Sequence, residues 1–175
     1  GKPYKPVEVV GDADDTGTIV TFHPDPEIFQ VTTIYKYDTL AARLRELAYL
    51  NKGIRLTLTD KRNLVNDVDE NGNELETTHF RSDVFYSKDG LKEFVEYLDG
   101  GAEKLIESPI YLETDKIIPI EIALQYNTSY TEKIYSYVNN INTIEGGTHL
   151  QGFKMGLTRT LKNYADKAGM LAKLK

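Results

Sequence analysis

Apolar residues recur at steps of three and four over residues 148–168. Steps of this size place side chains on one face of an α-helix, so we predict a helix whose apolar face is buried. The members of this stripe are Leu150, Phe153, Leu157, Leu161, Tyr164 and Ala168. A diglycine at 146–147 permits a sharp turn before the helix. Thr148 and Gln151 have the spacing of a capping box, and Gly169 predicts a left-handed stop.

A second helical pattern precedes an alternating one over residues 38–58. Asp38 is a predicted N-cap for leucines at 40, 44, 47 and 50, and the stretch 51–53 (Asn-Lys-Gly) predicts the helix end. Ile54, Leu56 and Leu58 then alternate with polar residues, which is typical of a strand buried on one face. A helix packed on a half-buried sheet is expected.

The polar stretch 63–78 has two interpretations. Asp67, Asp69, Asn71 and Gly72 match the first half of a calcium-binding loop. However, Thr78 stands where the twelfth ligand should be a glutamate, and no amphipathic helices flank the stretch. Asn-Gly between two extended arms is a strong hairpin signal, so we predict a hairpin instead.

The remaining elements are shorter. We predict a strand over 17–22 and a short amphipathic helix over 91–98 that stops at the diglycine 100–101. Further strands are expected over 110–113, 118–126 and 133–139. A tight turn at 127–129 would join the last two strands as an antiparallel pair.

Composition narrows the function classes. The chain of 175 residues has no cysteine, which excludes disulfides, and a formal net charge of -6, which argues against a general grip on nucleic acid. No apolar run predicts a membrane span or a secretion signal, so a cytoplasmic protein without a membrane partner is expected. Basic residues do gather on the last predicted helix, as a solvated face or a local DNA contact. They are Lys154, Arg159, Lys162, Lys167 and Lys173.

Aromatic and histidine residues give weaker signals. The tyrosines at 111, 126, 130, 135 and 137 could form a base-stacking platform, but tyrosine is also common in half-buried strands, and we predict packing. His23, His79 and His149 lack the spacing of metal ligands, and His149 should bond locally. No motif of a nucleotide-binding P-loop, a nucleophile elbow or a zinc protease is present.

Several stretches, in order, resemble one protein family. EGGTHLQGFKMGLTRTL at 145–161 is similar to a segment of the ATPase half of the bacterial DNA gyrase B family, whose close relative is the B subunit of topoisomerase IV. Further similar stretches are TGTIVTFHPDPEIF at 16–29, LAARLRELAYLNKGIRLTLTDKR at 40–62, GLKEFVEYL at 90–98, ALQYN at 123–127 and YVNNI at 137–141.

The resemblance implies an α+β fold. Residues 1–81 would be the C-terminal portion of a GHKL-type ATP-binding domain, an α/β sandwich. Residues 82–175 would be a ribosomal-protein-like transducer domain with a left-handed βαβ crossover, lacking its C-terminal strands. The helix after EGGTH would be the crossover element.

The resemblance also implies a function. The intact protein would be an ATP-dependent type IIA topoisomerase that negatively supercoils double-stranded DNA, using ATP and Mg²⁺. It would act with the gyrase A subunit in an A2B2 heterotetramer and form a homodimer through its ATP gate. By resemblance Thr18 would line the adenine pocket, and Arg159 and Lys162 are candidates to face DNA.

No catalytic residue and no metal ligand of that family maps onto this chain, so the piece alone is expected neither to hydrolyse ATP nor to hold a cofactor. Two alternatives stay open. One is the B subunit of topoisomerase IV, which relaxes and unlinks DNA. The other is a non-enzymatic interaction module, because this fold type also occurs in ribosomal and chaperone proteins.

Overall fold

A computed structural model describes residues 2–170, and the chain divides into two compact units, Gly1–Tyr35 and Lys36–Lys175. In the described part of the first unit the chain forms one turn at 26–28 and no strand, so the predicted strand 17–22 is wrong. A strand needs a neighbour for its backbone hydrogen bonds. Ile19 and Val20 are largely exposed, at 96% and 77%, because no segment within 2–35 pairs with them.

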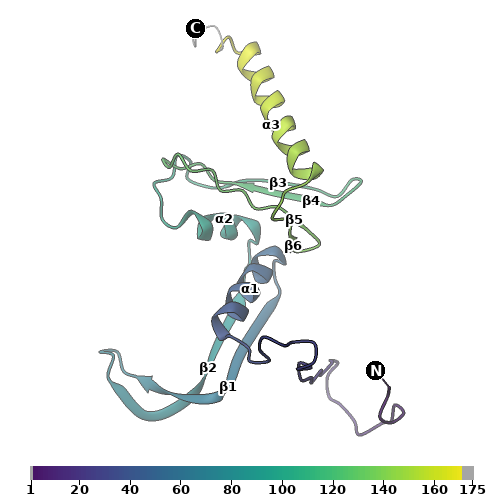
Figure 1. The fold of residues 1–175 in the computed structure, drawn as a ribbon. Coiled ribbons are helices and arrows are strands. Elements are labelled where there is room, and N and C mark those ends of the chain that lie inside the picture. The colour runs from purple at the N-terminus through teal and green to yellow at the C-terminus, as the bar shows by residue number, and fades with distance from the viewer. Residues whose placement is uncertain (1, 171–175) are drawn as a thin grey trace. The chain divides into compact units, whose positions relative to one another are not determined.

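The second unit begins with a helix packed on a long hairpin, as predicted (Figure 1). The helix α1 spans Tyr37–Leu50, and the hairpin pairs β1, Arg55–Val68, with β2, Glu74–Tyr86, in antiparallel register. The buried core between them contains Tyr37, Ala41, Ala48 and Phe85, with Leu44, Leu56 and Leu58 packed against it. Asp38 lies inside the first turn rather than at the N-cap, which is Lys36.

The tip of this hairpin is a turn organised by one carboxylate. Gly72 has a φ of 84°. This value lies in the left-handed region that glycine adopts without strain. Oδ1 of Asp69 accepts hydrogen bonds from the backbone amides of Asn71 and Asn73, each at 2.8 Å, and its Oδ2 accepts one from the Asn73 side chain at 2.9 Å. The hairpin prediction is confirmed, and both oxygens of Asp69 serve the turn.

A second helix and hairpin follow. The helix α2 spans Leu91–Asp99 and ends at Gly100, which has a φ of 66°. This is the predicted left-handed stop. The strands β3, Ile110–Thr114, and β4, Ile120–Leu124, pair antiparallel, and α2 packs on β4.

The predicted pairing of strand 133–139 with strand 118–126 is wrong. Residues 126–128 are already bonded elsewhere, because the amide of Leu105 donates to the carbonyl of Tyr126 at 2.9 Å and that of Thr128 to Glu103 at 3.0 Å. Instead β5, Tyr137–Val138, pairs with β6, Ile141–Asn142. The two asparagines 139–140 between them have φ of 50° and 63°. Two successive left-handed residues suit a two-residue hairpin.

The last helix, α3, spans Thr148–Lys167 without interruption, as predicted (Figure 1). Its end at Gly169, with a φ of 65°, is also as predicted. The amide of Met170 donates to the carbonyl of Ala165 and that of Gly169 to Asp166. Together these two bonds form a Schellman motif.

Two details of α3 differ from expectation. The capping box is absent, because Gly147 is the N-cap and Thr148 is already helical. No side chain of α3 is buried: Leu161 is 54% and Tyr164 63% exposed. The stripe predicted to be buried is therefore only partly covered by residues 2–170, at Leu150, Phe153 and Leu157. Across the same residues, no helix combines the length and apolarity needed to cross a membrane.

Candidate functional site

The loop that starts α3 is the most organised part of the segment that resembles a known family. Gly146 has a φ of 77° and Gly147 a φ of 158°. Residues with side chains rarely adopt either value. The amide of Gly146 donates to the carbonyl of Thr143 at 2.8 Å, and the amide of Gln151 donates to the carbonyl of Gly147 at 3.1 Å. The diglycine thus turns the chain directly into the first turn of the helix.

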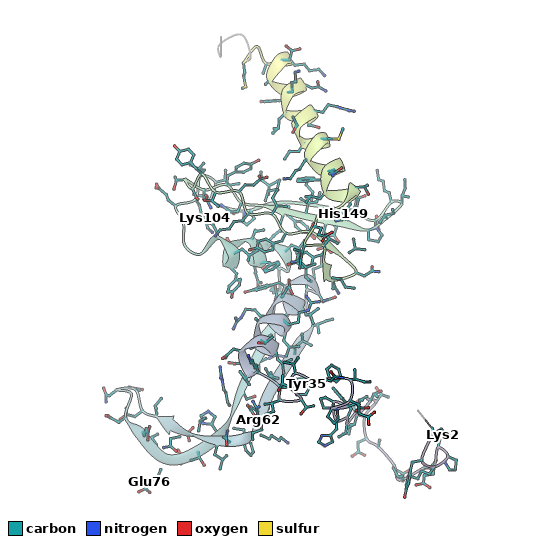
Figure 2. The ribbon with its side chains drawn as sticks, viewed as in Figure 1. Lys2, Tyr35, Arg62, Glu76, Lys104 and His149 are labelled. Carbon is teal, nitrogen blue, oxygen red and sulfur yellow. The ribbon has the colours of Figure 1, made fainter. Side chains whose placement is uncertain are left out.

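One threonine connects this loop to the preceding hairpin and to the helix. The backbone amide of Thr143 donates to the carbonyl of Ser136 at 2.8 Å, and the two hydroxyl oxygens lie 2.6 Å apart. Oγ1 of Thr143 also lies 3.3 Å from Nε2 of His149. Figure 2 shows His149 at the start of α3. The predicted local bonding of His149 is confirmed. A side chain at Gly147 would place its Cβ 2.8 Å from the His149 ring, so the ring would have to move to admit it.

A pocket of about 180 Å³ lies between this loop and the residues before β5. Its lining is apolar, hydroxyl or amide, with no charged side chain: Ile134, Tyr135, Ser136, Asn142, Thr143, Ile144, Gly146 and Leu150. Such a lining offers no counter-charge to a phosphate and no acid or base to a reaction. The loop is therefore suited to hold the start of α3 rather than to do chemistry.

The predicted basic residues lie along the exposed surface of α3. Arg159 and Lys162 are both exposed, and neither forms an ion pair within residues 2–170. Lys154 differs, since its Nζ lies 3.3 Å from Oε1 of Glu132. Lys173 lies outside the described residues. Lys167, like Arg159 and Lys162, is exposed and has no ion pair within residues 2–170. These three cations on α3 are therefore available to contact a polyanion.

The packing predicted for the five tyrosines is confirmed for Tyr111 and Tyr137, which are partly buried, and not for the three exposed ones. The Tyr135 and Tyr137 rings lie 6.4 and 6.3 Å from the ring of Phe94, which is itself 7% exposed. Nζ of Lys92 lies 4.9 Å from the centre of the Tyr111 ring, a cation–π contact. Burial and a hydrogen bond to Glu113 raise the pKa of Tyr111. Tyr126, Tyr130 and Tyr135 are nevertheless 47%, 106% and 48% exposed.

Thr18 lies in the first unit, with an exposed side chain. Arg159 and Lys162 belong to the second unit, so the structure describes no site that combines all three. Within residues 2–170, no group of three or more histidine or acidic side chains is placed to hold a metal ion. The roles of Thr18, Arg159 and Lys162 remain predictions.

Comparison with known proteins gives a consistent result. A sequence model of the family described as DNA gyrase B matches residues 90–175. The B subunit of DNA gyrase from Eisenibacter elegans is 57% identical over 176 residues, covering 100% of this chain and 34% of the relative. That of Cytophaga hutchinsonii is 56% identical over 177 residues, with the same coverage of 100% and 34%.

A solved structure agrees with the sequence matches. The crystal structure of the 43K ATPase domain of Thermus thermophilus gyrase B, in complex with an aminocoumarin, aligns with a TM-score of 0.64 at 34% identity. The alignment covers 84% of this chain and 36% of the solved one. The fold is therefore α+β, and the class of protein is the one that includes this solved domain of gyrase B.

Within that class, the chain belongs to the DNA gyrase B family. It spans about a third of the length of the curated relatives named above.

Proposed function

We propose that this chain is the part of a gyrase B subunit that transmits ATP binding and hydrolysis to DNA strand passage. The intact protein is an ATP-dependent type IIA topoisomerase that introduces negative supercoils. The observation that carries the proposal is the 57% identity to a gyrase B subunit over the full length of the chain. Identity at this level, spread over the whole chain, leaves little room for a change of role.

The division of labour follows the resemblance. Residues 1–81 form the end of the ATP-binding domain, and residues 82–175 form most of the transducer domain. Strand β2 runs from Glu74 to Tyr86 without a break. The boundary at residue 81 therefore separates two proposed functions and does not coincide with the end of a strand. A strand that follows α3 in the intact protein would complete the left-handed crossover and cover the exposed apolar stripe.

ATP and Mg²⁺ are held mainly by parts of the intact protein other than this chain, with Thr18 contributing to the adenine pocket. Support for ATP comes from the solved neighbour, which is an ATPase domain. Arg159 and Lys162 face the DNA duplex, which fits their exposure and their lack of ion pairs within residues 2–170. The partners are double-stranded DNA, the gyrase A subunit and a second copy of the B subunit across the ATP gate, in the cytoplasm.

The named relatives favour gyrase over topoisomerase IV, since each is a gyrase B subunit. The same identities argue against the alternative of a non-enzymatic interaction module.

The test uses the full-length subunit that contains this chain, combined with its cognate A subunit and relaxed plasmid. We expect ATP-dependent negative supercoiling. Unlinking and relaxation without supercoiling would assign the protein to topoisomerase IV, and a folded full-length protein without DNA-stimulated ATPase activity would defeat the enzyme proposal. In the same assay, Arg159→Glu should weaken stimulation by DNA, whereas Arg159→Lys, which keeps the positive charge, is the control and should retain it.

A further inference from the structure

Helix α1 is joined to the β5–β6 hairpin by three hydrogen bonds between residues far apart in the chain. The hydroxyl of Tyr137 donates to Oε1 of Glu46 at 2.6 Å. Nη2 of Arg43 donates to the backbone carbonyl of Asn140 at 2.8 Å. The side-chain amide of Asn140 donates to Oδ1 of Asn51 at 2.9 Å. All three bonds are partly buried, so solvent competes with them only in part.

The bonding groups are held in place both on α1 and on the β5–β6 hairpin. On α1, Arg43 and Glu46 lie one turn apart and also pair with each other, which fixes both side chains. On the hairpin, Asn140 has a φ of 63°. Asparagine tolerates this conformation better than most residues. This turn presents the carbonyl and the side-chain amide of the same residue to α1. Bonds to charged groups are the shorter and stronger kind, and two of the three involve Arg43 or Glu46.

The hairpin is in turn connected to the start of α3. Ser136, the residue before β5, is bonded to Thr143, the residue after β6, through backbone and hydroxyl groups. Thr143 then contacts His149 at 3.3 Å. A continuous series of hydrogen bonds therefore runs from α1 through the hairpin to the first turn of α3.

We infer that Arg43, Glu46, Tyr137 and Asn140 form a positioning latch that makes the hairpin and the start of α3 follow movements of α1. The inference rests on the proposed function, since it names the residues that would carry nucleotide-dependent movement from the ATP-binding domain into the transducer. A directional bond network favours one relative position of two elements, and a displaced α1 must either carry the hairpin with it or break these bonds.

The test is Tyr137→Phe in the full-length subunit, assayed with its A subunit and plasmid DNA. This change removes the hydroxyl while keeping the ring that packs on Phe94. We expect the ATPase rate without DNA to stay within about twofold of wild type. Stimulation of ATPase by DNA, and supercoils introduced per ATP, should each fall about fivefold or more, the lower end of ordinary coupling between two sites.

A second variant removes the hydrogen bond between Asn140 and Asn51. Asn140→Gly keeps the left-handed turn and the carbonyl that accepts from Arg43, but removes the amide bonded to Asn51. The same loss of coupling is expected. Combining it with Tyr137→Phe should cost less than the product of the two single losses, because both act on one latch.

The matched control is Tyr111→Phe. Its hydroxyl also donates to a glutamate, Glu113 at 2.9 Å on the same strand, and it interacts with Glu121 on the paired strand β4, so its bonds stay within the β3–β4 hairpin. If Tyr137→Phe retains DNA stimulation as well as Tyr111→Phe does, the inference is overturned. Equal losses of basal and DNA-stimulated rates would also overturn it, since they would show a purely structural role. Wild-type supercoiling in the same experiment separates either outcome from a failure of the proposed function.

Discussion

Helices α1 and α3 carry similar apolar patterns and differ in burial. In α1, Tyr37, Ala41 and Ala48 are buried, with exposed fractions of 7%, 7% and 2%. In α3 no residue is buried, although its apolar positions recur just as regularly along 20 residues. Both helices start and end close to where their sequences predict.

The difference lies in the segment of chain after each helix. The hairpin β1–β2 begins within a few residues of the end of α1 and packs back on it, so its cover is local in sequence. For α3, no strand or helix within residues 2–170 supplies such a cover. Periodicity therefore indicates which face of a helix is apolar. Whether that face is covered depends on the other segments of the chain that pack against the helix.

The strongest way to test this contrast is to remove a side chain from the α1 core. Phe85 on β2 is 6% exposed and packs in the cluster with Tyr37, Ala41 and Ala48. We expect Phe85→Ala to lower the free energy of unfolding by about 3–5 kcal/mol, the usual cost of truncating a buried aromatic residue. Denaturant unfolding of the purified chain, followed by circular dichroism, measures the change.

The control is the neighbouring residue on the opposite face of the same strand. Tyr86 is 49% exposed. Tyr86→Ala should therefore cost about 1 kcal/mol or less. Equal costs at the two positions would mean that α1 does not cover this face of the hairpin in solution.

Features set by neighbouring residues were predictable from the sequence. The Asn71-Gly72 turn, the stop of α2 at Gly100 and the stop of α3 at Gly169 each depend on the conformational freedom of one glycine. The Asn139-Asn140 turn was missed, although two residues tolerant of positive φ between extended segments are a usable signal.

Features set by distant pairing were not predictable. The segment 126–128 bonds with 103–105 rather than with the strand after it, a choice that depends on which backbone groups are free after folding. Likewise, Glu46 and Tyr137 are 91 positions apart, and no local pattern in either stretch signals their bond. The diglycine start of α3 was located correctly because it is local, whereas the role of Thr18 stays a prediction.

A smaller loss of stability is expected when a hydrogen bond at the edge of the α1 core is removed. The hydroxyl of Tyr37 donates to Oδ2 of Asp83 at 2.8 Å, and the guanidinium carbon of Arg81 lies 3.8 Å from the centre of the Tyr37 ring. Burial, followed by the hydrogen bond to Asp83, raises the pKa of Tyr37 above 10.0. Tyr37→Phe should cost about 1 kcal/mol at neutral pH, the ordinary net value of one hydrogen bond.

The raised pKa of Tyr37 also makes the free energy of unfolding depend on pH. Because the folded state keeps the phenol proton longer than the unfolded state, this stabilisation is complete below about pH 10 and is lost as pH rises through the folded pKa. Tyr37→Phe should therefore flatten the alkaline loss of stability, measured by unfolding at a series of pH values. Tyr4→Phe, at a residue 99% exposed, is the control and should leave the slope unchanged. An unchanged slope in both variants would contradict the assignment.

The smallest change in the free energy of unfolding is expected for a substitution on α3. This substitution tests most directly whether the apolar face of α3 is covered. Leu161 is 54% exposed. Leu161→Ala should therefore change the free energy of unfolding of this chain by less than about 0.5 kcal/mol. In the intact subunit, where we propose that a following strand covers the stripe, the same change should cost about 2–5 kcal/mol. Unfolding of the two proteins side by side measures both values. A large loss in the isolated chain would show that α3 is covered without the rest of the subunit, whereas no loss in either protein would show that its apolar face stays open even when the subunit is complete.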